Sequence, residues 1–456
     1  MSRRYHPRMA STGGRPRLTV LGTGYLGATH AVCMAELGFD VLGMDVDHAK
    51  VTRLSAGEVP FFEPGLEPLL RKNLEAGRLR FTTSYAEVAG FGDVHFLCVG
   101  TPQKAGEYAA DLSYVNSVVR GLAPHLTREC LVVGKSTVPA GTAHRVAGWL
   151  DADAPAGRAH GGGVDVAWNP EFLREGFAVE DTLTPDRLVF GVRSAYGEAM
   201  LRSAYAPVVA IETPVVITDF ATAELVKVAA NAFLATKISF INAMAEVCEA
   251  TGADVTKLSE ALSYDDRIGG RFLHAGLGFG GGCLPKDIRA FMARAGELGV
   301  DQALSFLREV DAINLRRRSR LVDLARELLD GSFQGSRVAV LGAAFKPNSD
   351  DIRDSPALDV ASTVQRQGAE VTVYDPAAMD NARRQYPDLT YAESALEVAA
   401  GADLVLHLTE WREFRDMDPA VLGEVVAKRN IVDGRNALDP QRWRDAGWYY
   451  RALGRP

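Results

Sequence analysis

Cys283 is the residue of this chain whose surroundings best suit nucleophilic chemistry. The segment Gly278–Gly282 places four glycines just before it, and Lys286 and Asp287 follow within four residues. Glycines leave the sulfur approachable, and a lysine or a helix start would lower the pKa of the thiol and favour the thiolate. We therefore predict that Cys283 is a nucleophile. The remaining cysteines stand in apolar runs and are predicted to be core thiols: Cys33, Cys98, Cys130 and Cys248.

A dinucleotide fingerprint stands near the start of the chain. The strand-like run Leu18–Leu21 leads into Gly22-Thr-Gly24-Tyr-Leu-Gly27, a GxGxxG sequence that opens a helical pattern. Such glycines permit a tight turn and close approach of a pyrophosphate to a helix N-terminus. Asp45 ends the next strand-like run, where a carboxylate would bind ribose hydroxyls and repel a 2′-phosphate, which favours NAD over NADP. The predicted NAD site contains Gly22, Gly24, Tyr25, Leu26, Gly27 and Asp45.

An NAD-binding fold combined with a reactive cysteine indicates oxidation through an aldehyde, with thiohemiacetal and thioester intermediates. The protein must then supply a base, an oxyanion partner and a hydrolytic water. The nine histidines show no metal-ligand spacing. No metal is predicted.

The elements that must position these residues are predicted by alternating patterns. Strand-like and helical patterns alternate through the first 210 residues and again after residue 336, which predicts βαβ units and doubly wound parallel sheets. The strand-like runs are Leu18–Leu21, Val41–Met44, Val94–Val99, Leu131–Val133, Val164–Trp168, Leu188–Phe190, Arg337–Gly342, Glu370–Tyr374, Leu404–Leu408 and Ile431–Asp433. The first helical patterns are Tyr25–Leu37, Leu112–Ala123 and Ala140–Leu150.

Two long helical patterns, Asp219–Ala250 and Gln302–Leu329, separate the alternating regions. The predicted fold is α/β: two Rossmann-like doubly wound domains joined by a long-helix spine, whose apolar content makes it a candidate subunit interface. The predicted boundaries are a disordered basic tail over 1–16, an NAD-binding domain over 17–212, a central helical domain over 213–330 and a second Rossmann-like domain over 331–456. The central domain carries Lys227 and Cys283.

Composition excludes several classes of protein. The 456 residues are 47% apolar and 24% charged, with a net charge of −8, so no global basic field favours nucleic acid or anionic lipid. Five cysteines without CxxC spacing argue against a disulfide scaffold and for a reducing cytoplasm. No strongly apolar run of 18 residues is recognised, so a soluble protein without a membrane span is expected.

The motifs, in their order, resemble the nucleotide-sugar 6-dehydrogenase family (UDP-glucose/GDP-mannose dehydrogenases), and within it the UDP-glucose 6-dehydrogenase branch. The resemblance runs from about Leu18 to Asn436. Beyond the two motifs above it rests on Val99-Gly-Thr101-Pro102, Ser136-Thr137-Val-Pro139, Asn169-Pro-Glu171-Phe-Leu-Arg-Glu175-Gly, Pro185-Asp-Arg187, Glu224-Leu-Val-Lys227-Val-Ala-Ala-Asn231, Asp266-Arg267-Ile-Gly, Phe345-Lys346-Pro, Asp350-Asp-Ile-Arg353-Asp-Ser-Pro and Asp433-Gly-Arg435-Asn.

The resemblance implies a four-electron oxidation of a sugar C6 alcohol to a carboxylate, with two NAD per turnover. Cys283 would capture the aldehyde, and Lys227 and Asn231, one helical turn apart, would stabilise the alkoxide or oxyanion. Asp287 and Thr137 would position the hydrolytic water. The family's two active-site glutamates match Glu171 and Glu175, which are four residues apart and would share a face if that segment is helical. The choice of base among Lys227, Glu171 and Asp287 stays open.

The resemblance also implies binding contacts. Further cofactor contacts would come from Lys50, Thr101, Thr137, Glu175 and Arg353. Substrate contacts would come from Glu171, Phe172, Leu173, Lys227, Asn231, Arg267, Phe279, Gly280, Lys346 and Arg435. Lys346 and Arg435 would meet the diphosphate of the nucleotide sugar. Arg267 matches an arginine that the family reaches across from a neighbouring subunit, so a homodimer or a higher homo-oligomer is expected.

Two other functions compete with this interpretation. A two-electron hydroxy-acid or sugar-acid dehydrogenase would share the glycine motif and the helical spine, but needs neither Cys283 nor a second α/β domain. A non-catalytic NAD-sensing or sugar-nucleotide-binding protein would be expected to lack Cys283, Lys227 or Asp287. Within the favoured function, the resemblance favours UDP-glucose, oxidised to UDP-glucuronate, as the substrate. The same reaction on dTDP-glucose or another nucleotide sugar is the alternative, because no motif reports on the base and a methyl-sized difference is worth only about 1–3 kcal/mol in a pocket.

Overall fold

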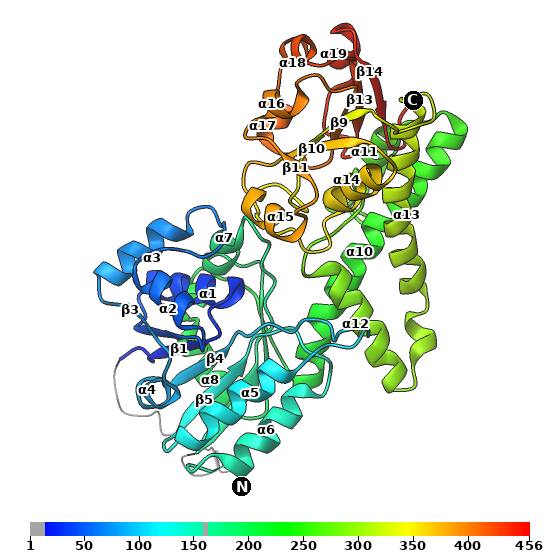
Figure 1. Cartoon of the computed structure of the whole chain (residues 1–456). Helices are drawn as coiled ribbons and strands as arrows, with labels where there is room; N and C mark the ends of the chain where they lie inside the picture. The colour runs from blue at the N-terminus through cyan, green and yellow to red at the C-terminus, as the bar shows by residue number, and fades with distance from the viewer. Residues whose placement is uncertain (1–13, 158–162) are drawn as a thin grey trace. The chain divides into compact units, whose positions relative to one another are not determined.

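The computed structural model describes residues 14–157 and 163–456 (Figure 1). Most of the predicted basic tail, residues 1–13, lies outside the described residues. The chain divides into two compact units. The first unit comprises 14–60, Gly65–Thr101 and Leu112–Leu225, and the second comprises Phe61–Pro64, Pro102–Asp111 and Val226–Pro456.

The first unit is built on an eight-stranded sheet with the order β3-β2-β1-β4-β5-β6-β7-β8. Its strands are β1 Leu18–Leu21, β2 Val41–Met44, β3 Leu79–Thr82, β4 Val94–Leu97, β5 Cys130–Gly134, β6 Val164–Trp168, β7 Leu188–Val192 and β8 Val215–Thr218. Its helices are α1 Tyr25–Glu36, α2 His48–Ser55, α3 Leu66–Glu75, α4 Tyr85–Phe91, α5 Ser113–Leu122, α6 Thr142–Asp153, α7 Ala178–Leu183, α8 Ala195–Ala204 and α9 Ala206–Ala210.

The strand order reverses at β1, which pairs in parallel with β2 on one side and with β4 on the other. Because every residue of these three strands is buried, they require the continuous apolar runs seen in the sequence. In an open α/β sheet the carboxyl ends of strands at such a reversal border a ligand-binding crevice. The loop after β1, which carries the glycine motif, therefore stands where this architecture binds ligands.

One strand pair departs from the predicted parallel sheet. β6 and β7 pair antiparallel, with Trp168 opposite Gly191, whereas the other neighbouring pairs of this sheet are parallel. A parallel return needs a crossover, usually a long helix packed along the sheet. The segment between β6 and β7 contains only the six-residue α7, so β7 runs back beside β6.

The second unit combines long helices with a six-stranded parallel sheet of order β11-β10-β9-β12-β13-β14. Its strands are β9 Arg337–Leu341, β10 Glu370–Tyr374, β11 Thr390–Tyr391, β12 Leu404–His407, β13 Asn430–Asp433 and β14 Tyr449–Ala452. Its helices are α11 Val255–Ser263, α12 Leu284–Glu297, α13 Phe306–Glu327, α14 Pro356–Arg366, α15 Met379–Gln385, α16 Ala395–Ala399, α17 Arg412–Arg415, α18 Pro419–Val425 and α19 Pro440–Asp445. The long helix α10, Phe220–Thr251, belongs to this unit from Val226 onward.

The helices α10, α12 and α13 pack around one apolar cluster. Ala232 and Ala235 from α10 meet Ile288 from α12 and Leu307 from α13. Phe279, which stands in the glycine-rich segment before Cys283, is buried in the same cluster. The core of the central helices thus also anchors the segment that carries the predicted nucleophile.

α10 is also long and apolar enough to cross a membrane by length and composition alone, although no such stretch is expected from the sequence. Its most apolar 18-residue window is 44% buried inside the chain. The same helix contributes to two buried clusters of the second unit. This packing accounts for the buried part of its apolar composition.

Candidate active site

The glycines of the motif that runs from the end of β1 into α1 are needed for two different reasons. Gly22 has a φ of +88°, and a Cβ on it would lie 2.7 Å from Val99 Cγ1. A Cβ on Gly27 would lie 1.7 Å from the Gly22 carbonyl oxygen, so the chain's own packing requires both glycines. A Cβ on Gly24, the N-cap of α1, would meet no heavy atom within 4 Å in the described part of the chain. The open space at this helix N-terminus fits a phosphate group.

The carboxylate of Asp45 follows β2 and braces the same loop. Its Oδ2 atom accepts hydrogen bonds from the Thr23 backbone N–H at 2.8 Å and from Lys50 Nζ at 3.0 Å, and its Oδ1 accepts from the Asp47 N–H at 3.1 Å. Burial alone would raise the pKa of Asp45, but the bonds from Asp47, Lys50 and Thr23 outweigh it and lower that pKa. Asp45 is therefore an ionised, oriented acceptor beside the glycine loop, as ribose binding requires.

Other predicted cofactor residues of the first unit lie in the neighbouring loops. Tyr25, the first residue of α1, accepts a hydrogen bond on its hydroxyl from the Gly176 N–H at 3.2 Å. Thr101 Oγ1 donates to the Thr137 carbonyl at 2.7 Å, which joins the loop after β4 to the loop after β5. Leu26 is half-buried in the first turn of α1. These contacts join the start of α1 to the loop after β6, and the loop after β4 to the loop after β5.

Glu171 and Glu175 would share a helix face only if their segment were helical, and it is not. Residues 171–174 have no regular structure, and a turn follows at 175–176. The Glu171 carboxylate accepts the Leu173 N–H at 2.6 Å, which occupies a backbone donor locally, and Gly176 has a φ of +80°. A side chain that bonds its own backbone and a left-handed glycine both end a helix. The Arg187 guanidinium lies 3.8 Å from the centre of the Phe172 ring in the same segment.

Glu224 is a structural residue of the site for which the sequence motifs predict no role of its own. Its carboxylate accepts the backbone N–H of Gly141 at 2.7 Å and of Ala143 at 2.6 Å, at the N-terminus of α6. The side chain is almost fully buried, in a residue 2% exposed. It thereby fixes the loop that begins at Thr137. The only sequence signal was its place in the motif that contains Lys227.

Cys283 is exposed and forms the N-cap of the 14-residue helix α12. The Asp287 backbone N–H donates to the Cys283 carbonyl at 2.8 Å, which closes the first turn. Because the N-terminal end of a helix carries partial positive charge, it stabilises a thiolate on this residue. The five cysteines, all within the described residues, form no disulfide.

A buried carboxylate stands one turn beyond Cys283. Asp287 is 2% exposed, and its Oδ2 accepts from Asn231 Nδ2 at 2.7 Å while its Oδ1 accepts from Lys286 Nζ at 2.6 Å. Asn231 and the equally buried Lys227 lie one turn apart on α10. The structure thus brings Asn231 and Asp287 together beside the helix that starts at Cys283.

The segment before Cys283 is closely packed. Gly278 and Gly281 have positive φ values of +93° and +83°, whereas the Arg353 side chain against Gly282 is 63% exposed and can move. A Cβ on Gly278 would lie 2.4 Å from Asn314 Oδ1, and one on Gly282 would lie 2.2 Å from the Arg353 guanidinium carbon. The side chain of Asn314, on α13, also accepts the Phe279 N–H at 2.8 Å and donates to the Phe279 carbonyl at 2.9 Å. The Phe279 side chain thus packs in the apolar cluster, and its backbone is bound by Asn314. The Arg353 guanidinium lies against Gly282, the residue before Cys283.

Arg435 connects three segments of the second unit. Its guanidinium donates to the carbonyls of Leu408 at 2.7 Å, Gly278 at 2.8 Å and Phe345 at 3.1 Å. Burial lowers the pKa of this arginine. Lys346 Nζ lies 5.5 Å from the centre of the Phe345 ring. Arg435 therefore braces the segment before Cys283, and its contact with substrate stays a prediction.

Arg267 lies on the surface of the single chain. Its side chain is 90% exposed and pairs with Asp265 at 2.7 Å. Its predicted reach into a neighbouring subunit stays a prediction.

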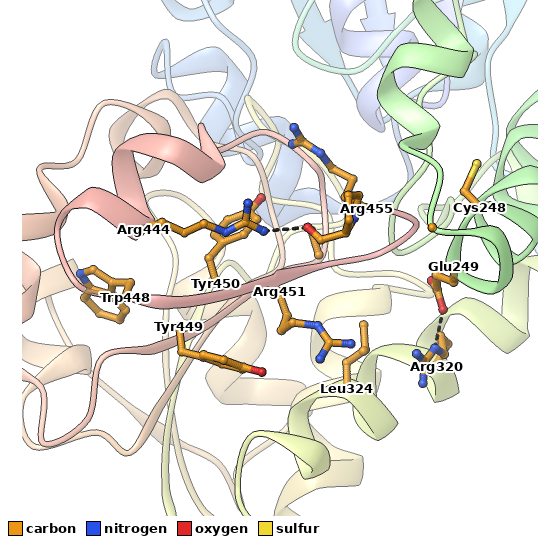
Figure 2. A pocket seen from close by; sticks show the side chains of 13 residues that line it. Cys248, Glu249, Arg320, Leu324, Arg444, Trp448, Tyr449, Tyr450, Arg451 and Arg455 are labelled. Atoms are coloured by element: carbon orange, nitrogen blue, oxygen red, sulfur yellow. Dashed lines mark hydrogen bonds and ion pairs between the residues drawn. The ribbon is translucent and has the colours of Figure 1, made fainter.

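A cavity of about 490 Å³ in the second unit contains none of the predicted site residues (Figure 2). Four arginines line it, and the chain's own oxygens engage all of them: Arg320 binds Glu249 at 2.7 Å, Arg444 the Pro456 carbonyl at 2.6 Å, Arg455 lies 3.4 Å from Asp254 and Arg451 lies 3.6 Å from Glu327. Between residues 14 and 456, the gap at 158–162 aside, no cluster of three His, Cys, Asp or Glu side chains suits a metal ion.

The doubly wound sheet with its glycine loop and buried Asp45 defines the class of dinucleotide-dependent dehydrogenases. Family models match the chain in three successive parts: the NAD binding domain of the UDP-glucose/GDP-mannose dehydrogenase family at residues 16–209, its central domain at 221–316 and its UDP binding domain at 339–440. The chain belongs to the UDP-glucose/GDP-mannose dehydrogenase family, and NAD is its cofactor.

Individual relatives agree with this assignment. The UDP-glucose 6-dehydrogenase of Rhizobium meliloti is 41% identical over 96% of this chain and 100% of its own length, and that of Pseudomonas aeruginosa is 42% identical over 96% and 98%. The solved structure of a UDP-glucose dehydrogenase from Pyrobaculum islandicum superposes with a TM-score of 0.89 at 38% identity, covering 98% of this chain and 100% of that one.

Proposed function

We propose that this chain oxidises UDP-glucose at C6 to UDP-glucuronate with two NAD per turnover. The observation that carries the proposal is the exposed Cys283 at the N-terminus of α12, with the hydrogen-bonded pair Asn231–Asp287 beside the same helix turn. A two-electron dehydrogenase needs no nucleophile of this kind. The relatives named UDP-glucose 6-dehydrogenase support the substrate.

The first unit supplies the cofactor site. The N-terminus of α1 at Gly24 would hold the pyrophosphate, and Asp45 would accept hydrogen bonds from the adenosine ribose. Lys50, which pairs with Asp45 at 3.0 Å, would keep that carboxylate oriented. When bound, NAD supplies the hydride acceptor for each oxidation step.

The first oxidation converts the C6 alcohol to an aldehyde. A protein base takes the hydroxyl proton as the hydride leaves C6, and Lys227 and Asn231 stabilise the negative charge that develops on the oxygen. A buried ammonium is suited to this work, because its charge acts in a medium of low polarity. Glu171 and Glu175 remain proposed as active-site glutamates of the first unit.

The second oxidation runs through Cys283. Its thiolate adds to the aldehyde carbon, a C–S bond forms, and the carbonyl electron pair moves to the oxygen, giving a thiohemiacetal. Loss of a second hydride from C6 gives a thioester. Water, positioned by Asp287 and Thr137, adds to the thioester, the C–S bond breaks, and the thiolate and the carboxylate are released. In total one alcohol, two NAD⁺ and one water yield one carboxylate, two NADH and three protons.

The nucleotide end of the substrate is assigned to the second unit. Lys346 and Arg435 would neutralise the diphosphate, and Phe279 and Gly280 would contact the sugar, with Phe172 and Leu173 contributing from the first unit. The match of residues 339–440 to the family's UDP binding domain supports this division of labour.

We also propose that two copies associate through α10. Four apolar side chains recur along it at intervals of seven or eight residues, which places them on one helix face: Leu225, Phe233, Phe240 and Val247 are 39%, 67%, 49% and 53% exposed. Such a stripe on a soluble surface favours a protein partner. Arg267 would then reach the neighbouring subunit's substrate. A cytoplasmic location stays a prediction.

The decisive experiment counts NADH formed per sugar consumed. UDP-glucose, dTDP-glucose, UDP-N-acetylglucosamine and GDP-mannose are each supplied in limiting amount with excess NAD, and absorbance at the NADH band is read at completion. Two NADH per UDP-glucose, and the highest kcat/KM with that sugar, are expected. One NADH per sugar would replace the proposal with a two-electron dehydrogenase, and a higher kcat/KM with dTDP-glucose would reassign the substrate.

A further inference from the structure

Asp354, in the loop that leads from β9 into α14, has an unusual backbone conformation. Its φ is +46°, in the left-handed region that residues other than glycine rarely adopt. Aspartate tolerates that region better than most residues, but it stays there only when its surroundings hold it. Contacts of its side chain and of the adjoining backbone hold Asp354 in this conformation.

Two arginines from different helices hold the Asp354 carboxylate. Arg318 on α13 donates to its Oδ1 at 2.8 Å, and Arg289 on α12 lies 3.4 Å from its Oδ2. Arg289 in turn binds Asp311 on α13 through two bonds of 2.9 and 3.0 Å. The arginine side chains are only 9% and 17% exposed, so solvent screens these ion pairs weakly. One carboxylate thus joins α12, α13 and its own loop.

The backbone at Asp354 lies directly against the segment that precedes Cys283. The Arg353 carbonyl accepts the Gly281 N–H at 2.9 Å. A Cβ on Gly280 would lie only 2.3 Å from the Asp354 carbonyl oxygen, so the two backbone segments pack too closely for any side chain at position 280. Cys283 also caps α12, the helix that carries Arg289. The segment before the thiol thus contacts the backbone of residues 353 and 354, and the helix after it contacts the Asp354 carboxylate through Arg289.

We propose that Asp354, clamped by Arg289 and Arg318, is a positioning residue that holds the Gly278–Cys283 segment and so places the Cys283 thiolate for attack. It touches no reacting atom itself and acts through the backbone of residues 353 and 354. The inference rests on the proposed function of Cys283 as the nucleophile.

The test is Asp354→Asn, because asparagine keeps the shape and tolerates the left-handed conformation but removes the charge. We expect kcat to fall by about tenfold or more while KM for NAD and for UDP-glucose changes less than about threefold, since a misplaced nucleophile costs rate more than binding. The rate at which iodoacetamide alkylates Cys283 should fall as well. Arg318→Lys, which keeps the positive charge, should lie between wild type and Asp354→Asn.

A matched control separates positioning from general stability. Asp254 is 26% exposed, against 25% for Asp354, and it also pairs with an arginine, Arg455, at 3.4 Å. Asp254→Asn should lower the melting temperature without changing kcat or the alkylation rate. The inference is overturned if Asp354→Asn retains wild-type kcat and alkylation, or if Asp254→Asn reduces both to the same extent. Should Asp354→Asn not fold, wild-type values for both quantities in Arg318→Lys overturn it.

The experiment also separates this inference from the proposed function. Full turnover in Cys283→Ser would show that the covalent mechanism is wrong, whatever Asp354→Asn does. Loss of turnover in Cys283→Ser, combined with wild-type kcat and alkylation in Asp354→Asn, would leave the mechanism standing and remove the positioning role alone.

Discussion

At the scale of single residues, burial and helix position separate one cysteine from the other four. Burial raises the pKa of Cys98 and of Cys130 to about 12, so those thiols stay protonated at neutral pH. Cys33 and Cys248 are buried too, whereas Cys283 is exposed at the N-terminus of α12. A thiolate is the reactive form of cysteine. The environment therefore selects Cys283 without any change of residue type.

Iodoacetamide at about pH 7.5 should consequently modify Cys283 well before any other cysteine. Peptide mass spectrometry at partial inactivation measures the modification at each site, and loss of activity should follow modification of Cys283 alone. Cys283→Ser should take up no label at position 283, retain NAD binding and lose steady-state turnover. Equal labelling of a buried cysteine at that stage would contradict the prediction.

At the scale of elements, the glycine motif between β1 and α1 contains one glycine that packing requires and another that borders open space. Gly27 is needed because the start of α1 lies against the Gly22 carbonyl, and Gly24 borders open space. Two glycines of one motif thus serve different ends: one lets the helix approach the strand, and the other leaves room for a ligand.

The matched pair Gly24→Ala and Gly27→Ala tests this division. Gly27→Ala should lower the melting temperature by several degrees or prevent folding, because its Cβ has no room. Gly24→Ala should keep the wild-type melting temperature without cofactor but weaken NAD binding by about tenfold or more, measured by calorimetry. Wild-type NAD affinity in Gly24→Ala would show that the open space at Gly24 has no binding role, and equal loss of stability in the two variants would contradict the division between packing and binding.

At the scale of the whole molecule, the proposed association of two copies through α10 links assembly to activity. The stripe along α10 is apolar and exposed, and the predicted role of Arg267 needs a neighbouring subunit. Assembly and activity should therefore change together.

Phe233→Glu places a charge on the most exposed side chain of the α10 stripe. Size-exclusion chromatography with light scattering should show a dimer or larger assembly for wild type and a smaller species for the variant, with reduced turnover. Tyr449→Glu, at a 59% exposed aromatic residue on β14, is the control and should keep the wild-type mass. A wild-type protein that is monomeric while fully active would exclude both the interface and the role of Arg267.

The sequence predicted the central strands correctly because a fully buried strand is a continuous apolar run along the chain. β1, β2 and β6 have the predicted bounds, and each is buried along its whole length. The strands β3, β8 and β14 lie toward sheet edges, where half-exposed side chains dilute the apolar run. Apolar runs therefore report central strands and miss edges.

By itself the sequence determined the glycine motif, the cofactor and the nucleophile candidate, because each depends on residues close together along the chain. It also determined the family, because short local motifs follow one another in the family's order. The tertiary structure decided the hydrogen-bond partners of Glu224, Asn314 and Asp354, which lie far away in sequence. It also decided that Glu171 and Glu175 share no helix face. Contacts between distant segments leave no local pattern in the sequence, so only the folded chain shows which residues support one another.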